Sequence, residues 1–285
     1  GSYNTASGGF STTLGQSNKA IANYSIAGGY KTSATGEKAV TFGNNNIASA
    51  LSSFAFGGYN TASGNFSTAL GQSNKSIGIH SVAAGFATSA EGSKSQAFGH
   101  STMAKGDYSH TFGKDVSAEN VAELSYSAGN LVGTSVDDVP SQVTRVTMSD
   151  VLAGNGNTFI LTVANSGTGF KPLPGTVGMA QMDVIVSSPG GAWAESIKHS
   201  NAYKCDANGT ITLLVDQGDN SLDGAFGHSH VGAINPNIDH NPYNTRWILN
   251  TANNRLEFQV ILTGGSVNMN ARAFGEAKFI QLGYT

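Results

Sequence analysis

In the first 120 residues, small, apolar and polar positions recur with a fixed period of 14 residues. The position two before each marker glycine is small, and the position directly before the glycine is mostly Leu or Phe, as in Leu70 and Phe98. This alternation is typical of a β-strand. A fixed short period also predicts a solenoid whose units stack to bury their apolar faces. The marker glycines are Gly15, Gly29, Gly43, Gly57, Gly71, Gly85, Gly99 and Gly113.

Each period contains a second marker half a period later. Here Ala20, Ala34 and Ala48 recur, followed in most periods by another glycine two residues on. Fourteen residues are too few for the helix pair of a helical solenoid, which needs about 20 to 45. They suit two strands of about five residues each. We therefore predict a parallel β-roll with one coil per period, whose glycines supply positive φ or close backbone approach at the turns.

The Ser, Ala and Gly columns persist along the whole repeat. Side chains this small allow a second backbone to approach closely. In a coil this thin, we expect that neighbour to be another copy of the chain, which predicts a homotrimer.

The period ends after Gly113, because the next candidate glycine, Gly129, follows 16 residues later. Residues 117–130 then carry a short helix signal, with Ser117 as its cap and Glu119 in its first turn. We interpret this segment as the junction to a second domain.

Composition changes beyond the junction, because prolines appear and the strand signals lengthen. Runs of β-branched and aromatic residues are separated by turn signals, and the firmest hairpin turns near Asn253 and Asn254. Seven or more strands favour an antiparallel, jelly-roll-like β-sandwich. The predicted strands are 142–148, 158–163, 177–187, 211–215, 246–250, 256–262 and 277–282. The chain is thus predicted to be all-β, with a β-roll shaft at 1–120, a junction at 121–130 and a β-sandwich tip at 131–285.

The repeat resembles a known family. The pattern Ser-x-Ala-x-Gly, as in Ser67-Thr-Ala-Leu-Gly71 and Ser81-Val-Ala-Ala-Gly85, is similar to the head repeat of trimeric autotransporter adhesins. Similar repeats occur in the shafts of phage tail fibres, and Tyr108-Ser-His-Thr-Phe-Gly113 is close to the phage form. The resemblance covers residues 1–120 and implies a left-handed parallel β-roll in a homotrimer.

Two functions are compatible with this resemblance. A shaft followed by a compact β domain is expected of a phage tail fibre, whereas an adhesin is expected to continue into a coiled-coil stalk and a membrane anchor. No heptads follow here, so we expect part of a trimeric phage tail fibre. It would lie on the virion tail and bind a glycan or outer-membrane component of the bacterial host. The alternative is the head of a bacterial adhesin at the cell surface that binds host matrix.

Composition and motifs exclude other classes. The net charge is −3 and charged residues make up 12% of the chain, about half the usual share, so no nucleic-acid partner is expected. No apolar run is long enough to insert into a membrane. The single cysteine, Cys205, excludes an internal disulfide, and we expect its thiol to be buried or unreactive. No hydrolase motif or P-loop occurs. We therefore expect no enzyme, a tailspike depolymerase being the less favoured alternative.

The longest stretch without a strand signal, 216–245, is the predicted receptor-binding segment. A loop this long in a compact domain is usually functional or disordered. Flat aromatic rings beside Asn and Asp groups suit the faces and hydroxyls of sugars. A solvated loop without a ligand is the alternative. The candidate contact residues are Phe226, His240, Tyr243, Trp247 and Trp193.

Within this stretch, His228 and His230 form a His-x-His motif. In a strand both rings would share one face. Near a three-fold axis, three chains would supply six imidazoles, enough for one octahedral transition-metal ion. This resembles the metal-binding motif of some phage fibre tips, and two solvent-facing histidines are the alternative. The acidic run at 216–224 fits no standard calcium loop, so we expect turns there rather than a calcium site.

Overall fold

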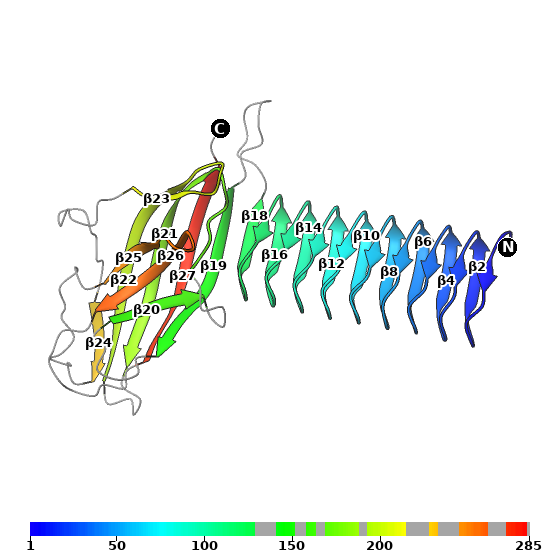
Figure 1. The fold of residues 1–285 in the computed structure, drawn as a ribbon, viewed down its shortest axis with the longest axis horizontal. Coiled ribbons are helices and arrows are strands. Elements are labelled where there is room, and N and C mark those ends of the chain that lie inside the picture. Colours follow the sequence, from blue (N-terminus) through cyan, green and yellow to red (C-terminus); the bar gives the residue numbers. More distant parts are fainter. Residues whose placement is uncertain are drawn as a thin grey trace. The chain divides into compact units, whose positions relative to one another are not determined.

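The structure is a computed structural model that describes residues 1–128, 141–151, 158–163, 169–187, 193–214, 228–232, 245–261 and 272–283. It comprises two compact units, Gly1–Asn130 and Leu131–Thr285. Every regular element among the described residues is a β-strand, which confirms the all-β prediction. The first unit is a parallel solenoid and the second is built from antiparallel strands (Figure 1).

The solenoid repeats a pair of strands, one of two residues and one of five, in each coil. Residues 14 apart lie side by side in both sheets, as Thr68 does with Val82. The short strands form a 9-stranded sheet: β1 (Thr5–Ala6), β3 (Lys19–Ala20), β5 (Ser33–Ala34), β7 (Ile47–Ala48), β9 (Thr61–Ala62), β11 (Lys75–Ser76), β13 (Ser89–Ala90), β15 (Met103–Ala104) and β17 (Ser117–Ala118). The long strands form the other: β2 (Thr12–Gln16), β4 (Ile26–Tyr30), β6 (Val40–Asn44), β8 (Phe54–Gly58), β10 (Thr68–Gln72), β12 (Val82–Phe86), β14 (Gln96–His100), β16 (His110–Lys114) and β18 (Leu124–Ala128).

Small side chains fill the interior of the solenoid. In one coil the buried positions are Asn60, Ala62, Ser67 and Ala69, and the equivalent columns are buried along the repeat. The small columns therefore face the inside of a single chain, and the expectation that they mark the approach of a second chain is wrong. The large apolar column before the glycine faces outward instead. Its exposed members include Leu14 (57%), Phe42 (37%), Leu70 (39%), Phe112 (42%) and Tyr126 (40%).

Glycine is needed where consecutive coils approach each other. Gly57 has φ 112°, and a Cβ built there would lie 2.0 Å from the carbonyl oxygen of Gly71 in the next coil. The predicted close approach is thus confirmed, but with the next coil of the same chain. Other turns use residues with side chains, such as Tyr59 and Phe66, both at φ 58°. The prediction that glycines supply the turns is therefore only partly right.

Buried asparagines tie the coils together. Asn60 donates from Nδ2 to the carbonyl oxygens of Phe56 and Gly71, both at 2.7 Å, and its Oδ1 accepts from the backbone N–H of Asn74 at 2.9 Å. Asn74 repeats the arrangement one coil further on. Each such amide supplies the hydrogen-bond partners that water cannot supply to backbone groups buried at the turn. The column therefore stabilises the stack with hydrogen bonds, in a core that has no large apolar side chains.

The helix predicted at 117–130 is wrong, because residues 117–128 belong to the ninth coil. Strands β17 and β18 continue both sheets, and Ser127 pairs with Gly113 in the glycine column. In the sequence Gly129 follows Gly113 after 16 residues instead of 14, so a search for glycines alone ends one coil too early. The alanine column already contains the signal, because Ala118 follows Ala104 at the same spacing.

Glu123 closes this last coil. In the coil before it, the backbone N–H groups of Lys105 and Gly106 donate to the carbonyl oxygen of Ala118 in the next coil. The equivalent donors of the ninth coil, Glu119 and Asn120, both donate at 2.8 Å to Oε2 of Glu123. The carboxylate thus takes the place of the carbonyl that a tenth coil would supply.

The second unit contains two antiparallel sheets that share one strand (Figure 1). The larger has the order β19 (Ser141–Val151), β27 (Arg272–Gly283), β21 (Thr176–Ser187) and β22 (Trp193–Cys205), and β23 (Ile211–Leu213) and β24 (His228–Gly232) both pair with β22. The smaller has the order β20 (Thr158–Val163), β26 (Arg255–Ile261) and β25 (Thr245–Asn250). β20 also pairs with the end of β19. This arrangement confirms the predicted antiparallel sandwich, with β22 and β24 in addition to the seven strands listed from the sequence.

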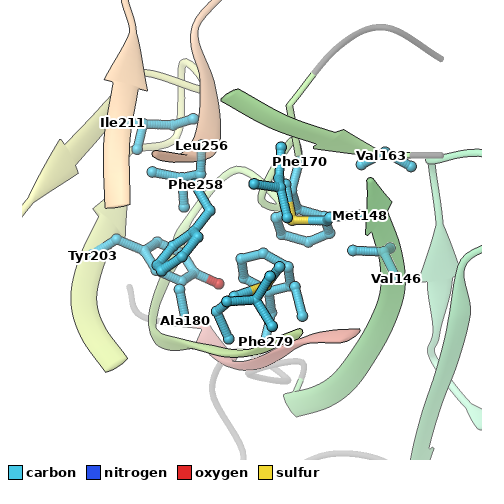
Figure 2. Packing of buried hydrophobic residues seen from close by; sticks show 14 of the residues in the cluster. Val146, Met148, Val163, Phe170, Ala180, Tyr203, Ile211, Leu256, Phe258 and Phe279 are labelled. Atoms are coloured by element: carbon cyan, nitrogen blue, oxygen red, sulfur yellow. The ribbon is translucent and has the colours of Figure 1, made fainter. Parts of the chain in front are cut away.

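Large side chains from both sheets meet in the core of this unit (Figure 2). The rings of Phe170 and Phe279 are stacked with centroids 3.6 Å apart, and Tyr203 meets Phe279 edge-on at 6.3 Å. Phe258 is also fully buried. Cys205 lies in the same core, where burial raises its pKa to about 11. The expected buried thiol is thereby confirmed.

Candidate binding site on the outer face of the larger sheet

Strict alternation along the larger sheet separates a core face from an outer face. On β21, Ala180, Met182 and Val184 are buried, whereas Asp183 and Ile185 between them are exposed. This alternation follows from the two-residue period of a strand. The strands β19, β27 and β22 alternate in the same way. Polar residues at alternate positions therefore gather on one outer face.

The strand register arranges these polar residues in two adjacent rows. The first row crosses four neighbouring strands as Arg145, Lys278, Gln181 and Ser200. The second row crosses the same strands as Thr147, Glu276, Asp183 and Lys198. Residues directly opposite on neighbouring strands lie close enough to interact. The two rows thus bring together charges that are far apart in the sequence.

A hollow of about 460 Å³ opens over these rows. It is lined by side chains of β19, β27, β21 and β22. His199, which follows Lys198 on β22, points to the other side of the sheet. Its imidazole is 3% exposed and meets the ring of Phe258 edge-on at 5.7 Å. His199 therefore belongs to the core and not to the surface of the hollow.

Two ion pairs lie in the hollow. Nη1 of Arg145 is 3.1 Å from Oε1 of Glu276, and Nζ of Lys198 is 3.6 Å from Oδ2 of Asp183. All four side chains are between 46% and 65% exposed. Ion pairs this exposed contribute about 0 to 1 kcal/mol each, because water screens them. Within the described part of the chain, Lys278 is the cation of the hollow that forms no ion pair.

The chemistry of the hollow suits a polar ligand. It offers cations, carboxylates, the Gln181 amide and the Ser200 hydroxyl at one surface. The next row along the strands is apolar, with Ile280 between Val143 and Met179, and Met179 is 43% exposed. Among the described residues, no three His, Cys, Asp or Glu side chains lie close enough together to hold a metal ion. The arrangement therefore supports recognition by hydrogen bonds and charge.

The predicted receptor-binding residues lie mainly outside the described part of the chain. This is the case for Phe226, His240 and Tyr243. Trp193 begins β22, opposite Gly232, and Trp247 lies on β25, opposite Phe258. The side chains of both tryptophans are outside the description. These five residues remain predicted contacts.

The His-x-His motif lies on a strand, as the prediction of a shared face requires. On β24, His228 pairs with Ile197 of β22, and His230 pairs with Glu195. The imidazoles of His228 and His230 are outside the described residues. The transition-metal site at these histidines remains a prediction.

The sequence pattern did not identify the hollow. Arg145 and Asp183 occupy polar positions of predicted strands, whereas Glu276 directly precedes the predicted strand 277–282. Which of these positions face one another depends on register between strands far apart in the sequence. Only the alternation of charged residues within each strand was available as a signal.

Comparisons with known proteins identify the repeat. Two copies of the YadA head domain repeat match residues 34–60 and 48–74. Residues 34–74 are therefore similar to the adhesin head repeat, which confirms the resemblance seen in the sequence. A crystal structure of the Acinetobacter baumannii phage AM24 tailspike protein is similar over 96% of this chain, with 10% identity and a TM-score of 0.25. This chain spans 54% of that tailspike.

No curated protein matches the chain. Helices with the length and apolarity needed to cross a membrane are absent from the described residues.

Proposed function

We propose that this chain is part of a homotrimeric, extracellular phage tail fibre that attaches to a receptor on the bacterial surface. The solenoid acts as the shaft and the β-sandwich as the receptor-binding tip. Attachment in this proposal needs no catalysis. The receptor is a surface glycan or an outer-membrane component.

The observation that carries this proposal is the apolar outer face of the long-strand sheet. Aromatic rings on this face stack from coil to coil, with centroids 5.8 Å apart for Phe42 and Phe56 and 5.6 Å apart for Phe98 and Phe112. In one chain these rings contact water, and large contiguous apolar patches mark interfaces. Three copies packed around a common axis would bury this face. Adhesin head repeats, which match here, support the same assembly.

A trimer also explains how weak sites would suffice for attachment. Three copies of the tip on one rigid body act at a high effective concentration, so their combined affinity exceeds that of one site. The shaft would set the reach of the tips and their spacing.

The second candidate is the head of a bacterial trimeric adhesin that binds host matrix. The match to YadA head repeats favours it. In that function the solenoid, rather than the sandwich, would make the contact. The two candidates therefore differ in both the target and the unit that binds it.

Binding of the fluorescently labelled full chain to a panel of bacterial strains and to matrix proteins such as collagen tests the proposal. We expect strain-restricted binding to bacteria that added surface polysaccharide competes away. Binding to matrix and not to bacteria would establish the adhesin function instead. Release of soluble oligosaccharide from envelopes would show an enzyme and contradict the proposal.

Analytical ultracentrifugation tests the assembly. We expect a trimer for the natural chain and dissociation when Phe98 and Phe112 are both changed to Ser. Tyr108→Ser is the matched control, because this aromatic residue is 50% exposed at a turn just before β16 and outside the long strands. A monomeric natural chain would contradict the trimer.

In the tip, Tyr243→Ala with Trp247→Ala should weaken cell binding and leave the trimer intact, whereas unchanged binding would place the site elsewhere.

A further inference from the structure

We propose that the hollow on the larger sheet binds a carboxylate-bearing sugar of a bacterial surface polysaccharide. This inference rests on the proposed attachment function and names the chemical class of its receptor. It also places a contact site on β19, β27, β21 and β22, whose lining residues lie outside the predicted segment 216–245 in the sequence.

The charge balance of the hollow favours a singly charged anion. Its two rows contain three cations, Arg145, Lys198 and Lys278, and two carboxylates, Asp183 and Glu276. The hollow therefore has an excess of one positive charge, whereas the whole chain has a net charge of −3. One carboxylate per sugar neutralises this excess. A doubly charged phosphate would overcompensate this excess and leave the hollow with a net charge of −1.

The cations are placed to hold a carboxylate. Arg145 and Lys278 face each other on neighbouring strands, whose backbones lie about 4.8 Å apart. A guanidinium binds a carboxylate through two parallel hydrogen bonds and has five donors, so Arg145 can bind a ligand and keep Glu276. Lys278 has no carboxylate partner among the described residues and adds a second positive charge.

The remaining groups suit the rest of a sugar ring. The Gln181 amide and the Ser200 hydroxyl follow Lys278 in the same row, and Asp183 lies in the next. These groups donate to and accept from sugar hydroxyls. The exposed Met179, in the apolar row alongside, offers a surface for the C–H groups of the ring. Charge, hydroxyl partners and an apolar edge thus lie together on one face.

Titration of the full chain with polygalacturonate tests the inference. The matched probe is the same polymer after chemical reduction of its carboxyl groups, which removes the charge and keeps the hydroxyl-rich backbone. We expect binding of the acidic polymer only. Lys278→Gln should weaken it about tenfold, the usual effect of losing one charge-assisted hydrogen bond, and Arg145→Gln at least as much. Lys204→Gln is the control, since this exposed cation of β22 lies outside the hollow.

The outcomes separate this inference from the proposed function. Equal binding of the reduced polymer, equal binding of inorganic polyphosphate, or unchanged binding by Lys278→Gln would each overturn the carboxylate site. If the natural chain still binds bacteria in such a case, the attachment function stands and its receptor site lies elsewhere. If polygalacturonate binds through Lys278 and no bacterial strain is bound, the attachment function fails and the sugar site remains.

Discussion

In the first unit the large apolar side chains lie on the surface and small ones fill the interior, whereas the second unit has the reverse arrangement. Ala62 and Asn60 are fully buried in the solenoid, where Phe42 and Phe112 are exposed. In the sandwich, Phe170, Phe279 and Tyr203 form the core. The first unit therefore depends on backbone hydrogen bonds and close coil contacts, and the second on apolar burial.

This difference has a consequence for assembly. Apolar burial is the main favourable term in folding, and the solenoid leaves much of its apolar surface unused in one chain. The sandwich completes its own core. We therefore expect the solenoid, and not the sandwich, to gain most of its stability from trimer formation. The two tryptophans of the chain, Trp193 and Trp247, both lie in the second unit, so tryptophan fluorescence reports on that unit alone.

The largest effect is expected from a single methyl group in the solenoid. In Gly57→Ala, the new Cβ would lie 2.0 Å from the Gly71 oxygen at φ 112°. The backbone strain costs about 1 to 3 kcal/mol, and the overpacking costs about as much again. Gly58→Ala is the control, because its nearest atom would be 4.0 Å away. Far-UV circular dichroism should show early melting for Gly57→Ala only, and equal melting of the two variants would contradict the close stacking.

The sandwich should respond to the opposite change, the loss of a large side chain. Phe279→Ala removes a buried ring stacked on Phe170 and should destabilise the second unit by about 3 to 5 kcal/mol. Ile185→Ala, at a 53% exposed position on the outer face, should change stability little. Urea unfolding followed by tryptophan fluorescence measures both. A similar loss in the two variants would show that the outer face is covered.

These contrasts explain how much of the structure follows from sequence. The coils were predictable because each contacts only its neighbours, so residues 14 apart, such as Gly57 and Gly71, reveal the register. Whether the small side chains face the interior of the coil or its surface was not predictable, because alternation along a strand does not show which of its two faces is buried. In the sandwich, strands followed from local composition, but the meeting of Arg145 with Lys278 and Glu276 depends on pairing across the whole unit.

A smaller effect is expected from the buried amide column. Asn60→Ala removes three hydrogen bonds and leaves the N–H of Asn74 without its acceptor, which costs about 1 to 3 kcal/mol. Asn60→Thr should cost less, because Thr32 and Thr88 already occupy this column in other coils. Thermal melting of the two variants gives the comparison. If Thr is as destabilising as Ala, the column does not act through hydrogen bonding.

The end of the solenoid provides the most local contrast, because Glu123 places a buried carboxylate in a column of Ser and Ala. Burial raises its pKa above the ordinary value of 4.5, and hydrogen bonds from Ser125, Asn120 and Glu119 lower it in part. In the folded coil, the Glu123 carboxyl group therefore keeps its proton to a higher pH than in the unfolded chain. The stability that Glu123 contributes is complete below pH 4.5 and is lost as the pH rises through the folded pKa.

Hydrogen exchange at the Glu119 and Asn120 amides follows this local stability, with the Lys105 and Gly106 amides of the preceding coil as an internal reference. Protection of the Glu119 and Asn120 amides should fall with rising pH, after correction for the intrinsic exchange rate. Glu123→Gln keeps an acceptor oxygen without a charge. In this variant, protection of the Glu119 and Asn120 amides should not depend on pH in this range, and the stability of the last coil should change by less than about 1 kcal/mol. Glu123→Ala should expose both amides and leave the reference pair protected. Should the pH dependence persist in Glu123→Gln, another group controls the end of the solenoid, and the carboxylate does not substitute for the next coil.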